Sequence, residues 1–291
     1  MVWRIGYQSV LEQVALEDSS ACVRMAAIPH INNQDVLEKI VFNDSDMYVR
    51  DEAVHYINNQ SVLEQVALED SSACVRMAAI PHINNQDILE EVAYTDSNWH
   101  VRNTAIQMIN NESFLVAIAF TDSEEFVRME AIQKITNETI LSLIVKKDMF
   151  WRIGEISIGR INNSLILKDI ANYAFLEYTR ISAVNKINDD IVLASIAIDC
   201  LHENIALLAV NKIRDELILE RIICDCWNDA VRSTIVKRIN NQSILENIVL
   251  NDSSDNVRRI AVAKIINSKI LHFVAINDSD DYVRLIANQL L

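Results

Sequence analysis

The sequence predicts an all-α fold: a right-handed α-solenoid of about eleven helical hairpins, each 26 residues long. The main observation is that Ile-Asn-Asn, or a close variant, returns every 26 residues without a slip. The chain has only three Gly and two Pro in 291 residues, which leaves no flexible linker and no loop-rich β architecture. We therefore expect one solenoid over residues 1–291, with degenerate copies at about 148–230. The register residue of the triplet is Ile5, Ile31, Ile57, Ile83, Ile109, Ile135, Ile161, Ile187, Ile213, Ile239 and Ile265.

The first helix of a copy is predicted at about Gln34–Phe42. The residue before it, Asn33, occupies a position that is Asn or Asp in ten of eleven copies, with Tyr7 as the exception. A short polar side chain there can accept a hydrogen bond from the backbone N–H two or three residues on. One residue of the helix is Leu in every copy, and the third residue after it is always Val or Ile, as expected of a face that packs in the core.

A turn at residues 43–46 and a second helix at about Met47–Ile57 complete the copy. Asn43-Asp44-Ser45-Asp46 combines turn residues with a second N-cap signal. Val49, Ala53, Val54 and Ile57 then fall on one side of a helix. Such a hairpin cannot bury its apolar face alone, so it must stack on its neighbours.

An Asp at the turn and an Arg six residues later recur together. Arg offers a forked donor, so the pairs predict a charge ladder in which each Arg binds carboxylates in the layers above and below. A catalytic acid–base pair is needed once, and the recurrence therefore favours a structural role. The pairs are Asp18/Arg24, Asp44/Arg50, Asp70/Arg76, Asp96/Arg102, Asp122/Arg128, Asp252/Arg258 and Asp278/Arg284.

This second-helix pattern, Asp-x-x-x-x-x-Arg with Val before the Arg and Ala three residues after it, resembles that of HEAT repeats. The stretch from Asp44 to Ala53 is a good example, and the resemblance covers nearly the whole chain. It implies a curved superhelix used for binding, with second helices on the concave side. The period is shorter than that of standard HEAT units. It is nearer to short HEAT-like repeats or to leucine-rich-variant repeats, in which the first helix would be 3₁₀.

Two segments of the chain are identical, residues 8–35 and residues 60–87, which lie two copies apart. The identity indicates duplication of a two-copy unit. A lengthening array suits a binding surface better than an active site, because an active site gains nothing from a second copy.

The copies between about residues 148 and 229 lose this pattern at the turn. The turn Asp is replaced by Ala174, Cys200 and Cys226, and the Arg by Gly154 and Ala206. The Ser after the turn Asp becomes Met149, Phe175, Leu201 and Trp227, with Phe150 and Trp151 beside the first. We expect these side chains to form an apolar ridge for a partner, since Trp and Phe are enriched at binding hot spots. The alternative is that the turns are reshaped and the aromatic rings enter the core.

A basic row occupies the position just before the register Ile. Six successive copies carry Lys or Arg there, which predicts a positive stripe for an acidic peptide or polyanion. The alternative is structural, because cations in the last turn of a helix favour its dipole. The row comprises Lys134, Arg160, Lys186, Lys212, Arg238 and Lys264.

Composition excludes several classes of function. A formal charge of −15 disfavours nucleic acid and anionic membranes as partners, and no apolar run is long enough for a membrane span. No secretory signal opens the chain, and five Cys without a disulfide framework favour a reducing, cytoplasmic location. Phosphate-binding Gly loops and His clusters for a metal are missing, so we expect no enzyme, no cofactor and no metal.

The sequence thus predicts a non-catalytic scaffold that binds a protein or peptide on a concave surface and on the central aromatic residues Phe150, Trp151, Phe175 and Trp227. One alternative is binding of nucleic acid or another polyanion along the row from Lys134 to Lys264. Another is end-to-end self-assembly, because Leu285, Ile286, Leu290 and Leu291 leave the last helix without the polar cap that repeat arrays need.

Overall fold

The structure is a computed structural model that describes residues 2–291, with side chains from residue 7 onward. Over that range it contains 22 α-helices, two short 3₁₀ helices and no strand, as predicted. The chain forms two compact units, Met1–Thr136 and Asn137–Leu291. The side chain of register residue Ile5 lies outside the described part. The prediction of a single domain over residues 1–291 stays a prediction.

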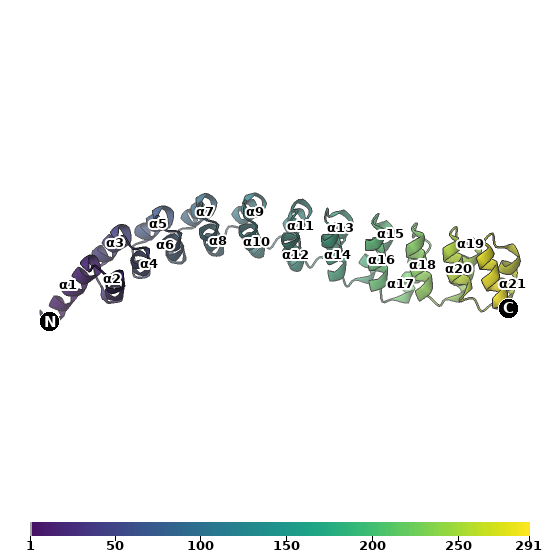
Figure 1. Cartoon of the computed structure of the whole chain (residues 1–291). Coiled ribbons are helices and arrows are strands. Elements are labelled where there is room, and N and C mark those ends of the chain that lie inside the picture. The colour runs from purple at the N-terminus through teal and green to yellow at the C-terminus, as the bar shows by residue number, and fades with distance from the viewer. Residues whose placement is uncertain (1) are drawn as a thin grey trace. The chain divides into compact units, whose positions relative to one another are not determined.

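The first unit holds five hairpins (Figure 1). Its helices are α1 (Val2–Glu17), α2 (Ala21–Ala27), η1 (Ile28–His30), α3 (Gln34–Asn43), α4 (Met47–Val54), α5 (Gln60–Glu69), α6 (Ala73–Ala79), η2 (Ile80–His82), α7 (Gln86–Thr95), α8 (Trp99–Met108), α9 (Glu112–Thr121) and α10 (Glu125–Lys134).

The second unit holds six hairpins. Its helices are α11 (Glu138–Lys147), α12 (Trp151–Arg160), α13 (Ser164–Tyr173), α14 (Glu177–Lys186), α15 (Asp190–Asp199), α16 (Glu203–Lys212), α17 (Glu216–Ile222), α18 (Asp229–Arg238), α19 (Gln242–Asn251), α20 (Asp255–Val262), α21 (Ser268–Asn277) and α22 (Asp281–Gln289).

Each odd-numbered helix packs against the even-numbered helix that follows it, so the predicted hairpins are confirmed. Within each unit the second helices contact one another in sequence, for example α4 with α6 and α16 with α18. The first helices also contact one another: α3 contacts α5, and α13 contacts α15. Each unit is therefore a two-layer stack of hairpins, the α-solenoid arrangement in which every hairpin covers its neighbour's apolar face.

The predicted N-caps form in all ten copies that have Asn or Asp there. In α9, for example, the Asn111 side chain accepts hydrogen bonds from the backbone N–H of Ser113 and of Phe114. The caps are Asn33, Asn59, Asn85, Asn111, Asn137, Asn163, Asp189, Asp215, Asn241 and Asn267. The first helices are therefore α-helices with regular starts, and the interpretation as 3₁₀ first helices is wrong.

The copy that lacks the cap behaves differently. Tyr7 cannot accept the capping bond as Asn does, and α1 runs through this position from Val2 to Glu17 without a break.

The second helices end slightly earlier than predicted. Ile109, for example, follows α8 in an extended conformation and donates its N–H to the carbonyl of Ile106. The described register Ile side chains, from Ile31 to Ile265, are all buried at these exits.

The core consists of the same columns in every layer. The Leu of the first helix is buried in ten copies, from Leu37 to Leu271, and is half-buried only at Leu11. The second helices contribute Val49, Ala53 and their equivalents. The identical segments also fold alike, since Pro29 and Pro81 lie in matching 3₁₀ turns at the ends of α2 and α6. Proline has no N–H to donate, which ends an α-helix at the same place in both copies.

Candidate binding surface

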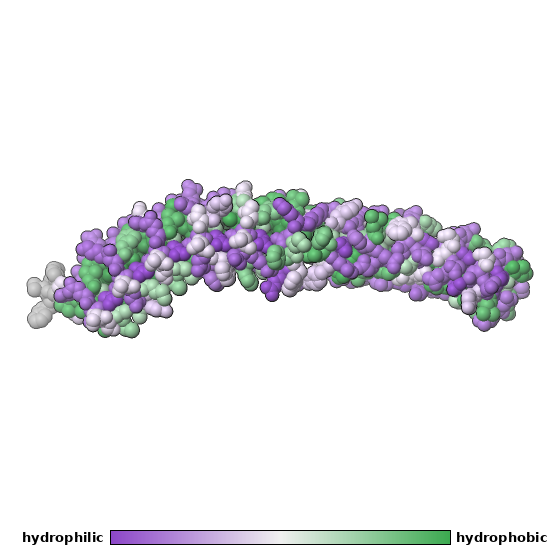
Figure 2. Space-filling model, turned by 45° about the horizontal axis from the view of Figure 1, so that its top comes forward, coloured by the Kyte–Doolittle hydropathy of each residue, from purple (hydrophilic) through white to green (hydrophobic). Residues whose placement is uncertain are grey.

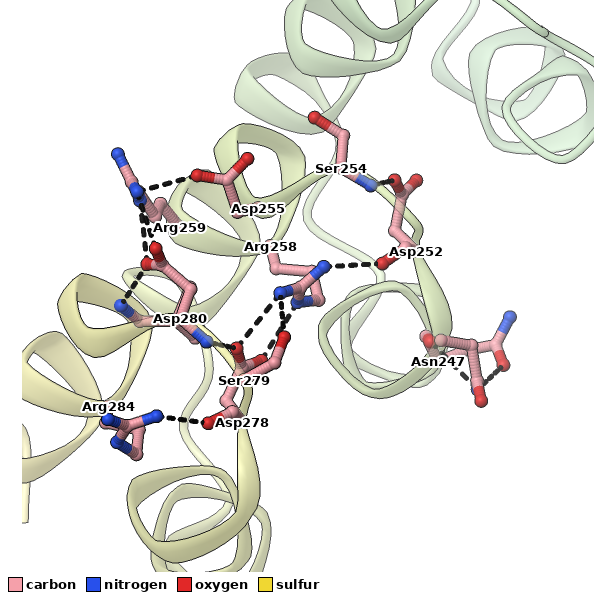
Figure 3. A network of polar contacts seen from close by, with 12 residues as sticks. Asn247, Asp252, Ser254, Asp255, Arg258, Arg259, Asp278, Ser279, Asp280 and Arg284 are labelled. Carbon is pink, nitrogen blue, oxygen red and sulfur yellow. Dashed lines mark hydrogen bonds and ion pairs between the residues drawn. The ribbon is translucent and has the colours of Figure 1, made fainter.

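The polar feature that repeats through both units is an Arg–Asp rung between consecutive turns, shown in Figure 3 for Arg258. Arg258 Nε lies 2.9 Å from Asp278 Oδ2, and Nη2 lies 3.0 Å from Oδ1, a bidentate pair. Its Nη1 donates to the backbone carbonyl of Asp252 at 2.8 Å. Nη2 also lies 3.1 Å from Ser279 Oγ. One guanidinium therefore ties its own turn to the turn of the following hairpin.

The complete rungs show that the predicted ladder exists, with one correction. Each Arg binds the carboxylate of the following turn only; it reaches its own turn through the backbone carbonyl and not through the Asp side chain. Pairing across 20 residues lets Arg232 join although its own turn has no Asp. The rungs are Arg24–Asp44, Arg50–Asp70, Arg76–Asp96 and Arg102–Asp122 in the first unit, and Arg232–Asp252 and Arg258–Asp278 in the second.

The turn Asp also accepts a hydrogen bond within its own turn, which explains why this residue is Asp. Asp44 Oδ1 accepts a hydrogen bond from the backbone N–H of Asp46 at 2.9 Å, which fixes the turn between α3 and α4. Burial raises the pKa of Asp44, but the hydrogen bonds from Arg24 and from the Asp46 amide outweigh it and leave the pKa below its ordinary value. The carboxylate is therefore held in its charged form at neutral pH.

The rungs of the degenerate copies are empty or incomplete. At the first position, Gly154 and Ala174 replace the Arg and the Asp together. A Cβ on Gly154 would lie 3.1 Å from Thr179 Oγ1, so the buried Thr179 occupies part of that space. Ala206 and Cys226 replace another pair together. Joint loss is the expected pattern, because losing one partner alone leaves an unpaired charge in a largely buried site.

The third degenerate rung keeps its Arg and lacks its Asp. Arg180 Nη1 donates to the carbonyls of Ala174 and Phe175 at 2.7 and 2.9 Å, as in a complete rung. The following turn presents the buried Cys200 in place of the carboxylate. Arg180 Nε is consequently buried with no hydrogen-bond partner. This is the exception in an otherwise satisfied ladder.

The residues after these turns form the predicted apolar ridge, which we define as Met149, Phe150, Trp151, Phe175, Leu201 and Trp227. All six are exposed, from 51% for Trp151 to 82% for Leu201. The alternative, in which the aromatic rings enter the core, is therefore wrong. The core side of the turn is instead filled by the small residues Ala174, Cys200 and Cys226. Figure 2 shows hydrophobic side chains exposed among hydrophilic ones on the side of the surface in view.

One exposed aromatic residue beside the ridge was not predicted from the sequence. Tyr178, on the first turn of α14, is exposed and meets Trp151 edge-on, with ring centroids 6.0 Å apart. Arg152 lies over the Trp151 ring, 5.4 Å from its centroid. The ring of Trp151 is thus held by two neighbours and still half-exposed, a geometry suited to contact with a partner.

The basic row is half-buried and occupied by backbone contacts. Lys186 Nζ donates to the carbonyls of Ile158 and Gly159 at 2.9 and 2.6 Å, at the end of the preceding second helix. In the first unit, Lys134 Nζ donates likewise to Ile106 and Gln107. Lys212, Arg238 and Lys264 repeat the contact in the second unit, and Arg160 is half-buried at the same position. These cations cap the helix of the layer before, whereas the sequence suggested their own helix.

A second set of exposed apolar side chains was also missed. Leu165, Ile191 and Leu217 lie at the second position of α13, α15 and α17 and are each about two-thirds exposed or more. In the other copies this position is Ser, Asp, Thr or Lys. The change to apolar residues in these three copies can therefore be seen in the sequence. Ile191 also borders a groove between α15 and α17, which Ala194, Ile198 and Ile218 line.

Other expected sites are placed as follows. Leu285, Leu290 and Leu291 are exposed at α22 and just beyond it, and Ile286 is half-buried. All five cysteines are free thiols, with Cys22, Cys74 and Cys224 exposed. Between residues 2 and 291, no three His, Cys, Asp or Glu side chains gather as a metal site would require. Over the same range no helix is both long and apolar enough to cross a membrane.

No family model matches the sequence, and no curated protein matches it. The chain is similar to a solved structure described as "Computational Design of Self-Assembling Cyclic Protein Homooligomers", at 12% identity over 97% of this chain and 86% of that chain. The TM-score is 0.10, too low to support an argument about function.

Proposed function

We propose that this chain is a non-catalytic scaffold of HEAT-like repeats that binds a protein or peptide through the apolar ridge of its second unit. The observation that carries the proposal is the exposure of the ridge at four successive turns where the other described copies place Ser. Single exposed apolar residues are common on protein surfaces, but a contiguous set marks an interaction site. The rings of Phe175 and Trp227 are large enough to act as anchors.

The basic row offers weaker support for polyanion binding. Five of its six cations already donate to main-chain carbonyls, namely Lys134, Lys186, Lys212, Arg238 and Lys264. The whole chain carries a charge of −15. A phosphate would have to compete with these internal contacts. The free thiols are consistent with a reducing compartment, where we place the protein.

The test uses substitutions that restore the array's own residue. A Phe175→Ser/Trp227→Ser variant gives these turns the Ser of the regular copies, so the fold should be kept. Wild type and variant are each used to capture partners from source-cell extract after chemical cross-linking. We expect specific partners to be retained by wild type and lost by the variant.

Tyr94→Ser is the matched control, since Tyr94 is an equally exposed aromatic residue in the first unit. It should retain the partners that the ridge variant loses. Equal capture by wild type and the ridge variant would refute the ridge as the binding surface. Light scattering of the wild type over a range of concentrations tests self-association separately.

A further inference from the structure

Arg180 differs from the other described ladder arginines of its unit in that its fork faces a neutral side chain. In Arg232 and Arg258, Nε and Nη2 both donate to an Asp carboxylate of the following turn. Arg180 donates only from Nη1, and its Nε is buried without a partner. Burial raises the pKa of the Cys200 thiol, which keeps that group uncharged at neutral pH.

The complete rungs show which group this fork accepts. In each of them the acceptor is a carboxylate, with Nε–O distances of 2.7–2.9 Å. A planar guanidinium and a carboxylate match in geometry and in charge, and the resulting bonds are stronger than neutral ones. A partly buried guanidinium without such an acceptor has N–H groups that make no hydrogen bond, and this costs free energy.

Exposed apolar side chains lie on both sides of this fork. Phe175 belongs to the turn whose carbonyl Arg180 contacts, and Leu201 follows Cys200. The residue equivalent to Leu201 touches Nη2 in two of the complete rungs: Ser71 Oγ lies 3.3 Å from Arg50 Nη2, and Ser279 repeats this with Arg258. Leu201 therefore stands at the outer nitrogen of the Arg180 fork, and the ridge has one cation between two apolar residues.

Building on the proposed function, we propose that Arg180 binds a carboxylate of the partner, supplied by an Asp or Glu whose neighbours in the partner peptide are apolar. The carboxylate approaches Nη2 from the exposed side, while apolar side chains pack on Phe175 and Leu201. The partner's acidic residue thus binds the outer of the two nitrogens that Asp binds in a complete rung. Charge complementarity selects this occupant, because Nη2 of Arg180 is a cationic donor and the hydrogen bonds of Arg180 within the chain come from Nη1 alone.

The test uses pairs of synthetic dodecapeptides as probes. One member of each pair carries Asp or Glu flanked two residues away on both sides by Leu or Phe, and its twin carries Asn or Gln instead. Fluorescence anisotropy measures binding to the full chain. We expect the acidic member to bind wild type roughly tenfold or more tightly than its twin.

Two variants should remove that preference by opposite routes. Arg180→Gln removes the cation, and Cys200→Asp supplies an internal carboxylate that occupies the fork. Cys200→Asp is also expected to be at least as thermally stable as wild type, so lost binding cannot be attributed to unfolding. A preference that persists in both variants would overturn the proposal.

Phe175→Ser separates this proposal from the proposed function. If the ridge binds peptides, this variant should weaken both members of a pair alike. Equal binding of both members to wild type, reduced by Phe175→Ser, would overturn the role of Arg180 and leave the ridge function intact. Failure of every acidic peptide to bind wild type would overturn the carboxylate proposal, whereas the ridge would still be judged by the capture experiment.

Discussion

Arg258 and Asp278 lie 20 residues apart in the sequence and are joined by two parallel hydrogen bonds that link α20 to the turn before α22. Their side chains are only 10% and 6% exposed. The adjacent Arg259 also pairs with carboxylates, those of Asp280 and Asp255, but its side chain is 34% exposed. The two neighbouring arginines allow a buried and an exposed ion pair to be compared directly.

Arg258→Gln should lower the free energy of unfolding by about 3 kcal/mol, because it leaves the Asp278 carboxylate buried and without its cation. Arg259→Gln should lower it much less, since exposed ion pairs contribute little to stability. Urea denaturation followed by circular dichroism gives both values. Equal losses in the two variants would show that burial of the rung does not matter.

Cys200→Asp should stabilise the chain, by about 1–2 kcal/mol, because it completes the rung of Arg180. The matched control is Cys226→Asp, which places the same carboxylate opposite Ala206; the nearby Arg232 already pairs with Asp252. That control should be less stable than wild type, since a buried charge lacks a partner. Thermal melts of the two variants measure the contrast, and a loss of stability in both would contradict the role given to Arg180.

Lys186→Met should lower the melting temperature, with a free-energy cost of about 1 kcal/mol, because the carbonyls of Ile158 and Gly159 lose a charged donor. Lys237→Met is a suitable comparison, since Lys237 is an exposed lysine at the end of α18. If the row is structural, neither substitution should change retention on a heparin column. Weaker retention of Lys186→Met alone would instead support the polyanion interpretation.

Stability should fall between about pH 4 and pH 2, in part through Asp280. Hydrogen bonds from Arg259 hold the pKa of Asp280 at about 2, below its ordinary value of 3.8. A carboxyl whose pKa is lower in the folded chain stabilises it above the unfolded value, and that contribution is lost as pH falls through the folded value. The melting temperature of Asp280→Asn should therefore depend less on pH in this window. Parallel pH curves for wild type and variant would contradict this assignment.

The fold was readable from the sequence because each layer repeats the same local chemistry. Asn caps, the Leu column and the turn Asp act within one copy or between neighbours, so their spacing was sufficient to predict the hairpins. The exposure of the ridge was also predictable, since residues that replace Ser at a turn keep that position's outward direction. The fork of Arg50 was predicted only in part, because its choice of Asp70 over the side chain of Asp44 depends on how hairpins are offset in space.

One other feature depended on three-dimensional detail, and two were local. The contact of Lys186 with the preceding helix requires the tilt between layers, which no local pattern specifies. The continuity of α1 through Tyr7 reflects the missing cap, which is a local signal in the sequence. The column of Leu165, Ile191 and Leu217 required only a comparison of copies.

The forward reach of each ladder arginine also constrains how the length of the array can change. Arg24 meets Asp44, and removal of residues 44–69 would bring Asp70 to the same distance along the chain from Arg24. Arg24, Arg76 and Arg102 would then each face a carboxylate of the following turn. A deletion one residue longer or shorter would put a different side chain in front of Arg24. The array can thus be copied or trimmed in whole periods without any new interface, and the identical segments 8–35 and 60–87 fit such a history.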